Sequence, residues 1–549
     1  MPRASWVRCA GCAALSAALL ITAFPPFTQP WCAWIALVPW LLALKRMTAR
    51  QAFWWSSLAG LVFFLGSLWW LIHVTLVGWL LLCAYLALFW GLFGLAAAWV
   101  LRRSGAPASL VVIPSLWVAA EYLRSYLLSG FGWNALAYSQ TSWLPVIQIA
   151  DLVGVWGVSW VVVVVNAALA GALSGASARR RWSGVGVAAG VVAATLAYGA
   201  WCLSAAPNAA QAGLQAGAAG DRITIAIVQG NVPQDEKWED EFKPAIVERY
   251  ARLTQAAMER HPALIVWPET SIPGIFGVEE PLTTDMLRYA QSLPVPLLTG
   301  APMGRVDQAR MAWELTNSAL LFSPDGSMMR HDKLHLVPFG EFVPGEPYAP
   351  WLRKVLPPIG EFVPGREYTV FSLPVPSFVV RDSGFANDES RITNHESRKA
   401  IRFSVLICFE DMFPELARTF AARGARILFT ITNDAWFGPT AAAYQHAQGS
   451  TFRAVELRLP VVRAANTGWS GCISPLGRWE ASVHDGAGRE LFVEGVATCS
   501  VTPGPALPTP LSGTFRRWGD WWAYLCLLLT LGYFARLRYN TRSHAPTAV

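Results

Sequence analysis

The chain has 549 residues, enough for two or three domains. Hydrophobic residues make up 54% of it, charged residues only 14%, and its mean hydropathy is +0.36. Soluble globular proteins carry about 25% charged residues. Many of the 28 Trp residues flank apolar runs, as aromatic residues do at membrane interfaces. The composition therefore excludes an ordinary soluble enzyme and predicts a polytopic membrane protein.

The net charge of +7 could indicate nucleic-acid binding, but the positions of the basic residues favour another explanation. Thirteen of them lie in short loops or tails beside apolar runs: Arg3, Arg8, Lys45, Arg46, Arg50, Arg102, Arg103, Arg179, Arg180, Arg181, Arg536, Arg538 and Arg542. Cytoplasmic loops of membrane proteins collect Lys and Arg in this way. We therefore attribute the basicity to membrane topology and expect no nucleic-acid partner.

Eight apolar segments are candidates for membrane spans, each of which needs about 20 mostly apolar residues. They are 8–24, 31–44, 53–72, 76–101, 109–128, 153–173, 184–203 and 518–535. The first two are short, with Pro25, Pro26 and Pro30 between them. A tight helical hairpin and, for the first segment, a cleaved signal peptide are both open interpretations.

The distribution of basic loops predicts which side the large insert occupies. If the N-terminus is cytoplasmic, the basic loops after the second, fourth and sixth spans and the basic C-terminal tail all fall in the cytoplasm. The opposite loops near 25–30 and 73–75 contain no Lys or Arg, and Arg516 and Arg517 are the one exception. We predict transmembrane helices in 1–204, an extracytoplasmic catalytic domain in 205–515, and a last helix with a cytoplasmic tail in 516–549.

The insert alternates strand-like and helix-like patterns, which indicates a layered α/β domain. An Ala/Gly/Gln-rich linker at 205–220 opens it, and a polar stretch without periodicity at 381–400 reads as an exposed insertion. The predicted strands are 223–229, 263–267, 295–299, 318–322, 403–409, 427–432 and 460–464, with helices at 244–260 and 414–423. Of nine Cys residues, only Cys408, Cys472 and Cys499 lie in this insert, which predicts no disulfide framework.

Three short motifs end or follow apolar strands, where α/β domains place functional groups. They are Trp267-Pro268-Glu269, the stretch 332–342 with Lys333 and Glu341, and the stretch 407–411 with Cys408 and Glu410. A Cys nucleophile needs a base and a donor for the oxyanion, roles that a carboxylate and an ammonium group can take. Taken singly, Cys408 could be a small core residue, Glu269 a helix cap and Lys333 a solvated cation. Their occurrence together favours a catalytic role for all three.

The order Glu, Lys, Cys resembles the nitrilase (carbon–nitrogen hydrolase) superfamily, and the match extends through 228–231, 432–437 and 463–468. Because this insert lies between membrane spans, nearly the whole chain resembles the apolipoprotein N-acyltransferases. The segments 130–134 and 154–159 support this in the membrane half. The resemblance implies an α-β-β-α sandwich joined to about eight transmembrane helices, in the inner membrane of a bacterium with the catalytic domain on the periplasmic side.

The resemblance also implies a ping-pong acyl transfer without a metal or cofactor. Cys408 would take an acyl chain from a phospholipid and pass it to the α-amine of S-diacylglyceryl-cysteine on an apolipoprotein. Glu269 would be the base, and Lys333 with a backbone N–H near Phe409 would hold the oxyanion. The supporting residues would be Glu341 and Glu410, and the substrate-binding residues Trp238 and Phe409. Phe409 stands where the family commonly has Tyr.

Two other functions use the same sequence features. A membrane-tethered amidohydrolase would have the same three residues but would use water as the second nucleophile. A transporter or lipid-binding scaffold would have an inactive soluble domain and charges lining a membrane path. Glu121, Arg124 and Asp151 are too few for such a path, and the three motif residues are all present.

Overall fold

The computed structural model describes residues 3–103, 106–174, 178–215, 222–307, 312–343, 361–374, 400–504 and 513–543. The chain forms two compact units. One consists of Met1–Leu203, Thr440–Glu456 and Leu511–Val549, and the other of Ser204–Pro439 and Leu457–Pro510. The insertion predicted at 381–400 lies, apart from its last residue, outside the described residues.

The first unit is helical, and helical residues occur at all eight predicted spans. Its main helices are α1 (Arg3–Ala23), α2 (Val38–Leu44), α3 (Ala49–Ser67), α4 (Leu76–Arg103), α5 (Ala106–Tyr126), α7 (Ala150–Leu173), α8 (Ala178–Gln215) and α15 (Trp521–Ser543). Among the described residues, four helices are long and apolar enough to cross a membrane: Trp6–Ala23, Leu76–Arg103, Ala150–Leu173 and Trp182–Ala205. The predicted apolar helices are therefore confirmed, whereas the count of about eight transmembrane helices is not.

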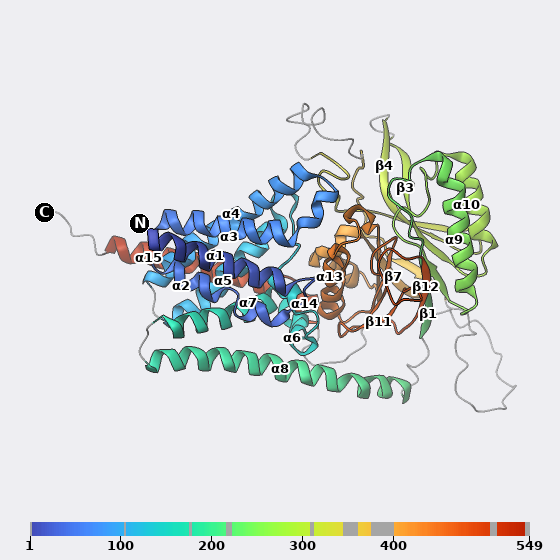
Figure 1. Ribbon diagram of the computed structural model, residues 1–549. Helices are drawn as coiled ribbons and strands as arrows, with labels where there is room; N and C mark the ends of the chain where they lie inside the picture. The colour runs from blue at the N-terminus through green and yellow to red at the C-terminus, as the bar shows by residue number, and fades with distance from the viewer. Residues whose placement is uncertain are drawn as a thin grey trace. The chain divides into compact units, whose positions relative to one another are not determined.

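The close packing of α3 against α4 shows how this sequence forms the bundle (Figure 1). Thr48 and Gln51 form a reciprocal capping box that starts α3. Small residues then allow the two helices to approach closely: a Cβ added to Gly94 would lie 1.7 Å from Ser56 Oγ. Small residues at helix contacts are typical of packing inside membranes.

Helix α8 differs from the prediction. The composition predicts a linker at 205–220, but α8 continues to Gln215. The predicted linker is rich in Ala, which has the highest helix propensity of the amino acids, and this explains why the helix extends into it.

The second unit contains two six-stranded sheets. The first has the order β12 (Gly495–Val501), β1 (Ile223–Gln229), β2 (Leu264–Val266), β3 (Leu297–Asp307), β4 (Ala312–Phe322), β5 (Met328–Asp332). The second has the order β11 (Trp479–Ser482), β10 (Gly471–Ile473), β9 (Val461–Ala465), β8 (Ile427–Thr432), β7 (Ile401–Ile407), β6 (Phe371–Leu373). The seven predicted strands all overlap strands of these sheets.

Each sheet has a parallel centre, formed by β1, β2 and β3 in one and by β7, β8 and β9 in the other. One apolar core contains alternate residues of both sheets, such as Ile225 of β1 and Val405 of β7, and therefore lies between them. Residues of the opposite parity, such as Ala226, pack with α9 (Lys243–Met258) and α10 (Glu280–Ser292), which lie side by side on the outer face of the first sheet (Figure 1). The predicted α/β domain with two sheets is thus confirmed.

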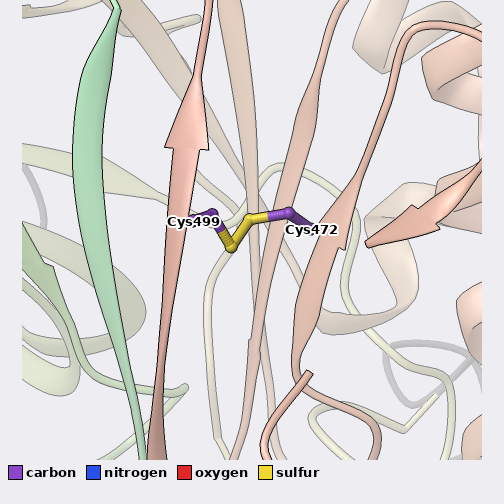
Figure 2. Close-up of a disulfide and its surroundings, with 2 residues drawn as sticks. All are labelled: Cys472 and Cys499. Atoms are coloured by element: carbon purple, nitrogen blue, oxygen red, sulfur yellow. A yellow bond between two sulfur atoms is a disulfide. The ribbon is translucent and has the colours of Figure 1, made fainter. Parts of the chain in front are cut away.

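A disulfide joins the two sheets: Figure 2 shows Cys472 of β10 bonded to Cys499 of β12. The cysteine distribution predicts no disulfide framework, and that prediction is wrong. The two residues are 27 positions apart, on short strands that the sequence pattern did not reveal. Only the packing of the sheets brings their Cα atoms to 6.3 Å, within the range that a disulfide spans.

Helix α13 (Ala442–Leu457) follows β8 in the chain but packs almost entirely within the first unit. Gln445 accounts for much of this packing. Its Oε1 accepts hydrogen bonds from Nε1 of Trp70 and Nε1 of Trp133. Its Nε2 donates to the carbonyl oxygens of Pro25 and Ser67. A short segment within the predicted catalytic region therefore belongs structurally to the helical unit.

Candidate active site

Glu269 lies three residues after the end of β2, in a segment that β3 approaches closely. A Cβ added to Gly300 of β3 would lie 2.6 Å from the Cα of Glu269 and 2.5 Å from the backbone nitrogen of Thr270. Only glycine leaves room for this approach, so Gly300 helps to set the position of the Glu269 backbone. The Glu269 side chain is buried.

The Glu269 carboxylate has partners from both sheets. Nδ2 of Asn317, on β4, donates to Oε1 at 2.7 Å, and the backbone N–H of Asn433, after β8, donates to Oε2 at 2.8 Å. Nζ of Lys333 lies 3.6 Å from Oε1. Hydrogen bonds to a carboxylate are among the stronger ones in proteins, so the orientation of this group is well defined.

Lys333 directly follows β5 and is 1% exposed. Its backbone N–H donates to the carbonyl oxygen of Asn317 at 2.8 Å, and its Nζ lies 3.0 and 2.9 Å from the two carboxylate oxygens of Glu341. Burial opposes the charge, but the carboxylates of Glu341 and Glu269 outweigh it and raise the pKa of Lys333 above its ordinary value. The lysine is therefore a permanent ammonium group at the centre of the site.

Glu341 and Glu410, the two predicted supporting carboxylates, make different contacts. Glu341 pairs directly with Lys333 and also accepts a hydrogen bond from Asn317 Nδ2 at 2.8 Å. Glu410 instead accepts hydrogen bonds from the backbone N–H groups of Leu334, His335 and Ile407 at 2.6, 3.0 and 2.7 Å.

Glu410 therefore ties the backbone beside Lys333 to the end of the strand before Cys408. Its own pKa is raised to about 7, chiefly because the group is buried. The prediction that a carboxylate orients the lysine thus has a direct basis in the contacts of Glu341, whereas the contacts of Glu410 are to the surrounding backbone.

Cys408 is the first residue after β7 and begins a single 3₁₀ turn, Cys408–Met412. Its φ is +55°, a backbone conformation that is uncommon for residues other than glycine and that clusters at functional sites. The side chain is 9% exposed. The turn therefore holds the sulfur at the end of the strand, in the same cluster of charges as Glu269 and Lys333, both of which act on its ionisation.

The Cys408 thiol is protonated in the resting protein. Burial and then the neighbouring Glu269 carboxylate raise its pKa well above the ordinary value, and Lys333 lowers it by less than they raise it. An ammonium group such as that of Lys333 is expected to favour the thiolate, and the effect of Lys333 on the thiol pKa does have that direction. Because the two opposing influences are larger, the thiol needs a base at the moment of attack, and Glu269 is the carboxylate beside it.

A buried ion-pair cluster supports the turn that holds Cys408. Arg463 of β9 donates from Nη1 to Asp411 Oδ2 at 2.9 Å and from Nη2 to Asp434 Oδ2 at 3.2 Å. All three side chains are buried. The arginine therefore joins the Cys408 turn to the segment after β8, the segment that also supplies the Asn433 N–H to Glu269.

The two predicted substrate-binding residues differ in exposure. Trp238 is 44% exposed, as a group that meets a substrate at the surface must be. Phe409 is buried, and its ring packs edge-on against Phe413 with centroids 5.1 Å apart. Neither role has been tested, so both stay predictions.

Sequence reasoning missed three polar residues of the site: Asn317, Asn433 and Lys237. Asn317 holds two carboxylates, and Asn433 holds one through its backbone, a contact that residue type does not reveal. Lys237 is buried and donates from Nζ to the carbonyl oxygen of Glu269 at 3.2 Å. Lys237, next to Trp238, and Asn433, within 432–437, both stand in stretches that resemble the family, but the resemblance assigns neither of them a role.

Among the described side chains, no group of three or more His, Cys, Asp or Glu is arranged to hold a metal ion. The expectation that the site uses neither a metal nor a cofactor stays a prediction.

Comparison with known proteins identifies both halves of the chain. Residues 16–168 match the family model of the apolipoprotein N-acyltransferase N-terminal domain, and residues 224–489 match that of carbon-nitrogen hydrolases. Among solved structures, yeast Nit3, a member of the nitrilase superfamily from Saccharomyces cerevisiae, covers 54% of this chain and 94% of its own, with 19% identity and a TM-score of 0.35.

Relatives similar over nearly their whole length are apolipoprotein N-acyltransferases. The protein of Geobacter metallireducens is 34% identical over 94% of this chain and 92% of its own. That of Rhodopseudomonas palustris is 33% identical over 90% of each chain. The chain therefore belongs to the apolipoprotein N-acyltransferase family.

Proposed function

We propose that this protein transfers a fatty acyl chain from a phospholipid, through a thioester on Cys408, to the N-terminal α-amine of S-diacylglyceryl-cysteine on an apolipoprotein. The observation that carries the proposal is the buried cluster of Glu269, Lys333 and Cys408 in a chain that matches apolipoprotein N-acyltransferases along nearly its whole length. We propose Glu269 as the base, Lys333 as an oxyanion donor and Cys408 as the nucleophile.

In the first half-reaction, Glu269 takes the thiol proton and the sulfur attacks the ester carbonyl carbon of the phospholipid. Lys333 and a backbone N–H near Phe409 hold the resulting oxyanion, a contribution for which one donor typically accounts for about 100-fold or more in rate. The C–O bond then breaks, Glu269 returns its proton to the leaving alkoxide, and a lysophospholipid departs. The raised pKa of the Cys408 thiol is the reason that this step needs a neighbouring base.

In the second half-reaction, the α-amine of the apolipoprotein attacks the thioester carbonyl carbon. A C–N bond forms, the C–S bond breaks, and Cys408 regains a proton through Glu269. The same oxyanion donors serve both steps. Glu341 keeps Lys333 charged through both by contacting Nζ with its two oxygens.

We further propose a multi-pass topology of about eight spans in the bacterial inner membrane, with the catalytic domain on the periplasmic side. The basic residues of the alternate loops support this orientation. The disulfide between Cys472 and Cys499 supports it independently, because disulfides persist in the periplasm and are rare in the cytosol. In this topology both lipid-anchored substrates reach the site from the membrane surface.

The alternative of a membrane-tethered amidohydrolase uses the same nucleophile but water as the acceptor. The match of residues 16–168 to the acyltransferase N-terminal domain and the length over which the named relatives align favour transfer.

The test is mass spectrometry of the Cys408 peptide after the purified protein has been incubated with phosphatidylethanolamine, before and after addition of a diacylated lipopeptide. We expect an acyl adduct on Cys408 that disappears as N-acylated lipopeptide forms. Cys408→Ala should give no adduct, while Cys12→Ala, a free cysteine of α1, should behave as wild type. Release of free fatty acid with unmodified lipopeptide would establish the hydrolase instead, and absence of any wild-type adduct would refute the site.

A further inference from the structure

The α-ammonium form of the acceptor must lose one more proton during acyl transfer than a water molecule would lose during hydrolysis. An α-amino group has an ordinary pKa of about 7.7–8.0, so near neutral pH it arrives mostly as an ammonium group. It must lose one proton before its nitrogen can attack and a second as the amide forms. Regeneration of the Cys408 thiol takes up only one of them. A second group in the site that accepts a proton would therefore let the predominant ammonium form of an amine acceptor react, whereas water attacking the thioester loses only one proton.

Lys237 is a second buried amine, in contact with the backbone of Glu269. It lies in the loop after β1, which is fixed by Asn466: the Asn231 N–H donates to the Asn466 carbonyl oxygen, and the Val232 N–H to Asn466 Oδ1, both at 2.9 Å. The Lys237 side chain is 2% exposed and the next side chain, Trp238, is 44% exposed. Consecutive residues thus point into the site and out of it.

The Lys237 amine contacts Glu269, the residue proposed as the catalytic base. Its Nζ donates to the carbonyl oxygen of Glu269 at 3.2 Å, and it interacts electrostatically with the Glu269 carboxylate and with Cys408. A lysine has three donor positions, and the described residues supply this one hydrogen bond to Nζ. The amine therefore has unused hydrogen-bonding capacity beside the reacting groups.

We propose that Lys237 accepts the first proton of the incoming α-ammonium group and so converts it into the nucleophile that attacks the thioester. This inference rests on the proposed function and adds a catalytic residue to its second half-reaction.

The two lysines of the site have opposite electrostatic environments. Burial lowers the pKa of Lys237 to about 7, and Glu269 and Cys408 only partly offset it, whereas the carboxylates around Lys333 raise the pKa of that residue. Lys333 thus stays charged and stabilises negative charge, while Lys237 is readily available as the neutral amine. Titratable neighbours whose pKa values are driven apart are typical of groups with different catalytic roles.

The charges of the site also suit a cationic acceptor. With Lys237 neutral, the Lys333 ammonium group faces two carboxylates, Glu269 and Glu341, which leaves one negative charge to attract the α-ammonium. A proton then passes from that nitrogen to Lys237 Nζ. The amine attacks, the C–N bond forms and the C–S bond breaks, and the second proton passes through Glu269 to the Cys408 sulfur. Lys237 finally releases its proton to water.

The experiment measures the two half-reactions separately in Lys237→Met, Lys237→Arg and wild type. Thioester formation is followed on the Cys408 peptide, and transfer is followed from the preformed thioester to the diacylated lipopeptide. At pH 7 we expect both variants to form the thioester within a few-fold of wild type but to transfer it about tenfold more slowly, because only roughly a tenth of an α-amine with a pKa of about 7.7–8.0 is unprotonated at that pH. Lys243→Met, which removes a partly exposed lysine paired with Asp240 and Glu279, should change neither step.

Two further measurements distinguish proton transfer from positioning. In wild type the transfer rate should level off above about pH 7, whereas in Lys237→Met it should keep rising to about pH 9 as the acceptor loses its proton in solution. Hydroxylamine, a largely unprotonated nucleophile at neutral pH, should accept the acyl chain equally fast from wild type and Lys237→Met.

Transfer at the wild-type rate in Lys237→Arg would overturn the proposal, because arginine keeps the hydrogen-bond donors but is permanently charged and cannot accept a proton. Equal losses in both half-reactions, or with hydroxylamine as well as with the lipopeptide, would also overturn it and would leave Lys237 as a positioning residue. Failure of the proposed function is distinguishable, because wild-type protein would then form no thioester or would not pass it to the lipopeptide.

Discussion

The backbone N–H of Asn433 donates to Oε2 of Glu269 at 2.8 Å, although the two residues follow strands of different sheets. Glu269 follows β2 of the first sheet and Asn433 follows β8 of the second. The orientation of the proposed base therefore depends on the packing of one sheet against the other. The same is true of Glu410, which comes after β7 and accepts hydrogen bonds from residues after β5.

Asn317→Ala is expected to slow thioester formation by about tenfold to 100-fold, since the amide Nδ2 donates to both Glu269 and Glu341. Removal of a donor from a buried acceptor costs about 1–3 kcal/mol. The measurement is the initial rate of lysophospholipid release. Thr316→Ser, one residue earlier on β4, keeps its hydroxyl group and serves as the control. A rate in Asn317→Ala equal to that of the control would show that the two carboxylates need no bridge.

Glu269→Gln is expected to have opposite effects on two reactions of Cys408. The Glu269 carboxylate raises the pKa of the thiol, so its removal leaves the influence of Lys333 less opposed and makes the thiolate easier to form. Alkylation of Cys408 by iodoacetamide at pH 8 should therefore become faster. Acyl transfer from phospholipid should nevertheless be lost, because the base is absent. Peptide mass spectrometry separates Cys408 from the other cysteines, and slower alkylation in the variant would contradict this account.

The pH dependence of stability should carry a contribution from Glu410. Burial raises the pKa of its carboxyl group from 4.5 to about 7, so between these values the folded state binds more protons than the unfolded state. This contribution is fully present below pH 4.5, is lost as the pH rises through about 7, and is worth at most about 3 kcal/mol. Thermal unfolding in detergent between pH 5 and 8 measures it. Glu410→Gln should show a smaller fall in Tm over this interval, and an unchanged fall would assign the pH dependence to other groups.

Reduction of the Cys472–Cys499 disulfide should lower the stability of the two-sheet unit. Its loop of 27 residues corresponds to about 3.5 kcal/mol of unfolded-state entropy at 25 °C in the chain-entropy account. The measurement is the Tm with and without dithiothreitol. The variant with both Cys472→Ser and Cys499→Ser should have a Tm that does not respond to dithiothreitol. An equal response of wild type and variant would mean that the reductant acts elsewhere.

The sequence predicted the features that depend on local patterns. Glu269 and Cys408 each follow a short apolar run, and an apolar run that ends in a functional residue is visible without a structure. Lys333 instead follows the charged stretch Arg330–Asp332, so only the resemblance to a family pointed to it. The bridge made by Asn317, the buried amine of Lys237 and the disulfide are not visible, because each depends on which strands become neighbours. The length of α8 is likewise hard to predict, since a run of small residues is typical of a linker although Ala favours helix.

The packing of helix α13 is another feature that local sequence patterns did not predict. Its sequence continues the pattern of the α/β domain, yet Gln445 makes four hydrogen bonds to groups of the helical unit. Gln445→Leu would remove the hydrogen bonds from Nε1 of Trp70 and Nε1 of Trp133, at about 0.5–1.5 kcal/mol for each bond lost. We expect a lower Tm by tryptophan fluorescence in detergent. Gln448→Leu, one turn later on α13, removes a single hydrogen bond to Thr141 and should lower the Tm less. Equal effects would mean that packing of α13 depends on its apolar residues rather than on the Gln445 contacts.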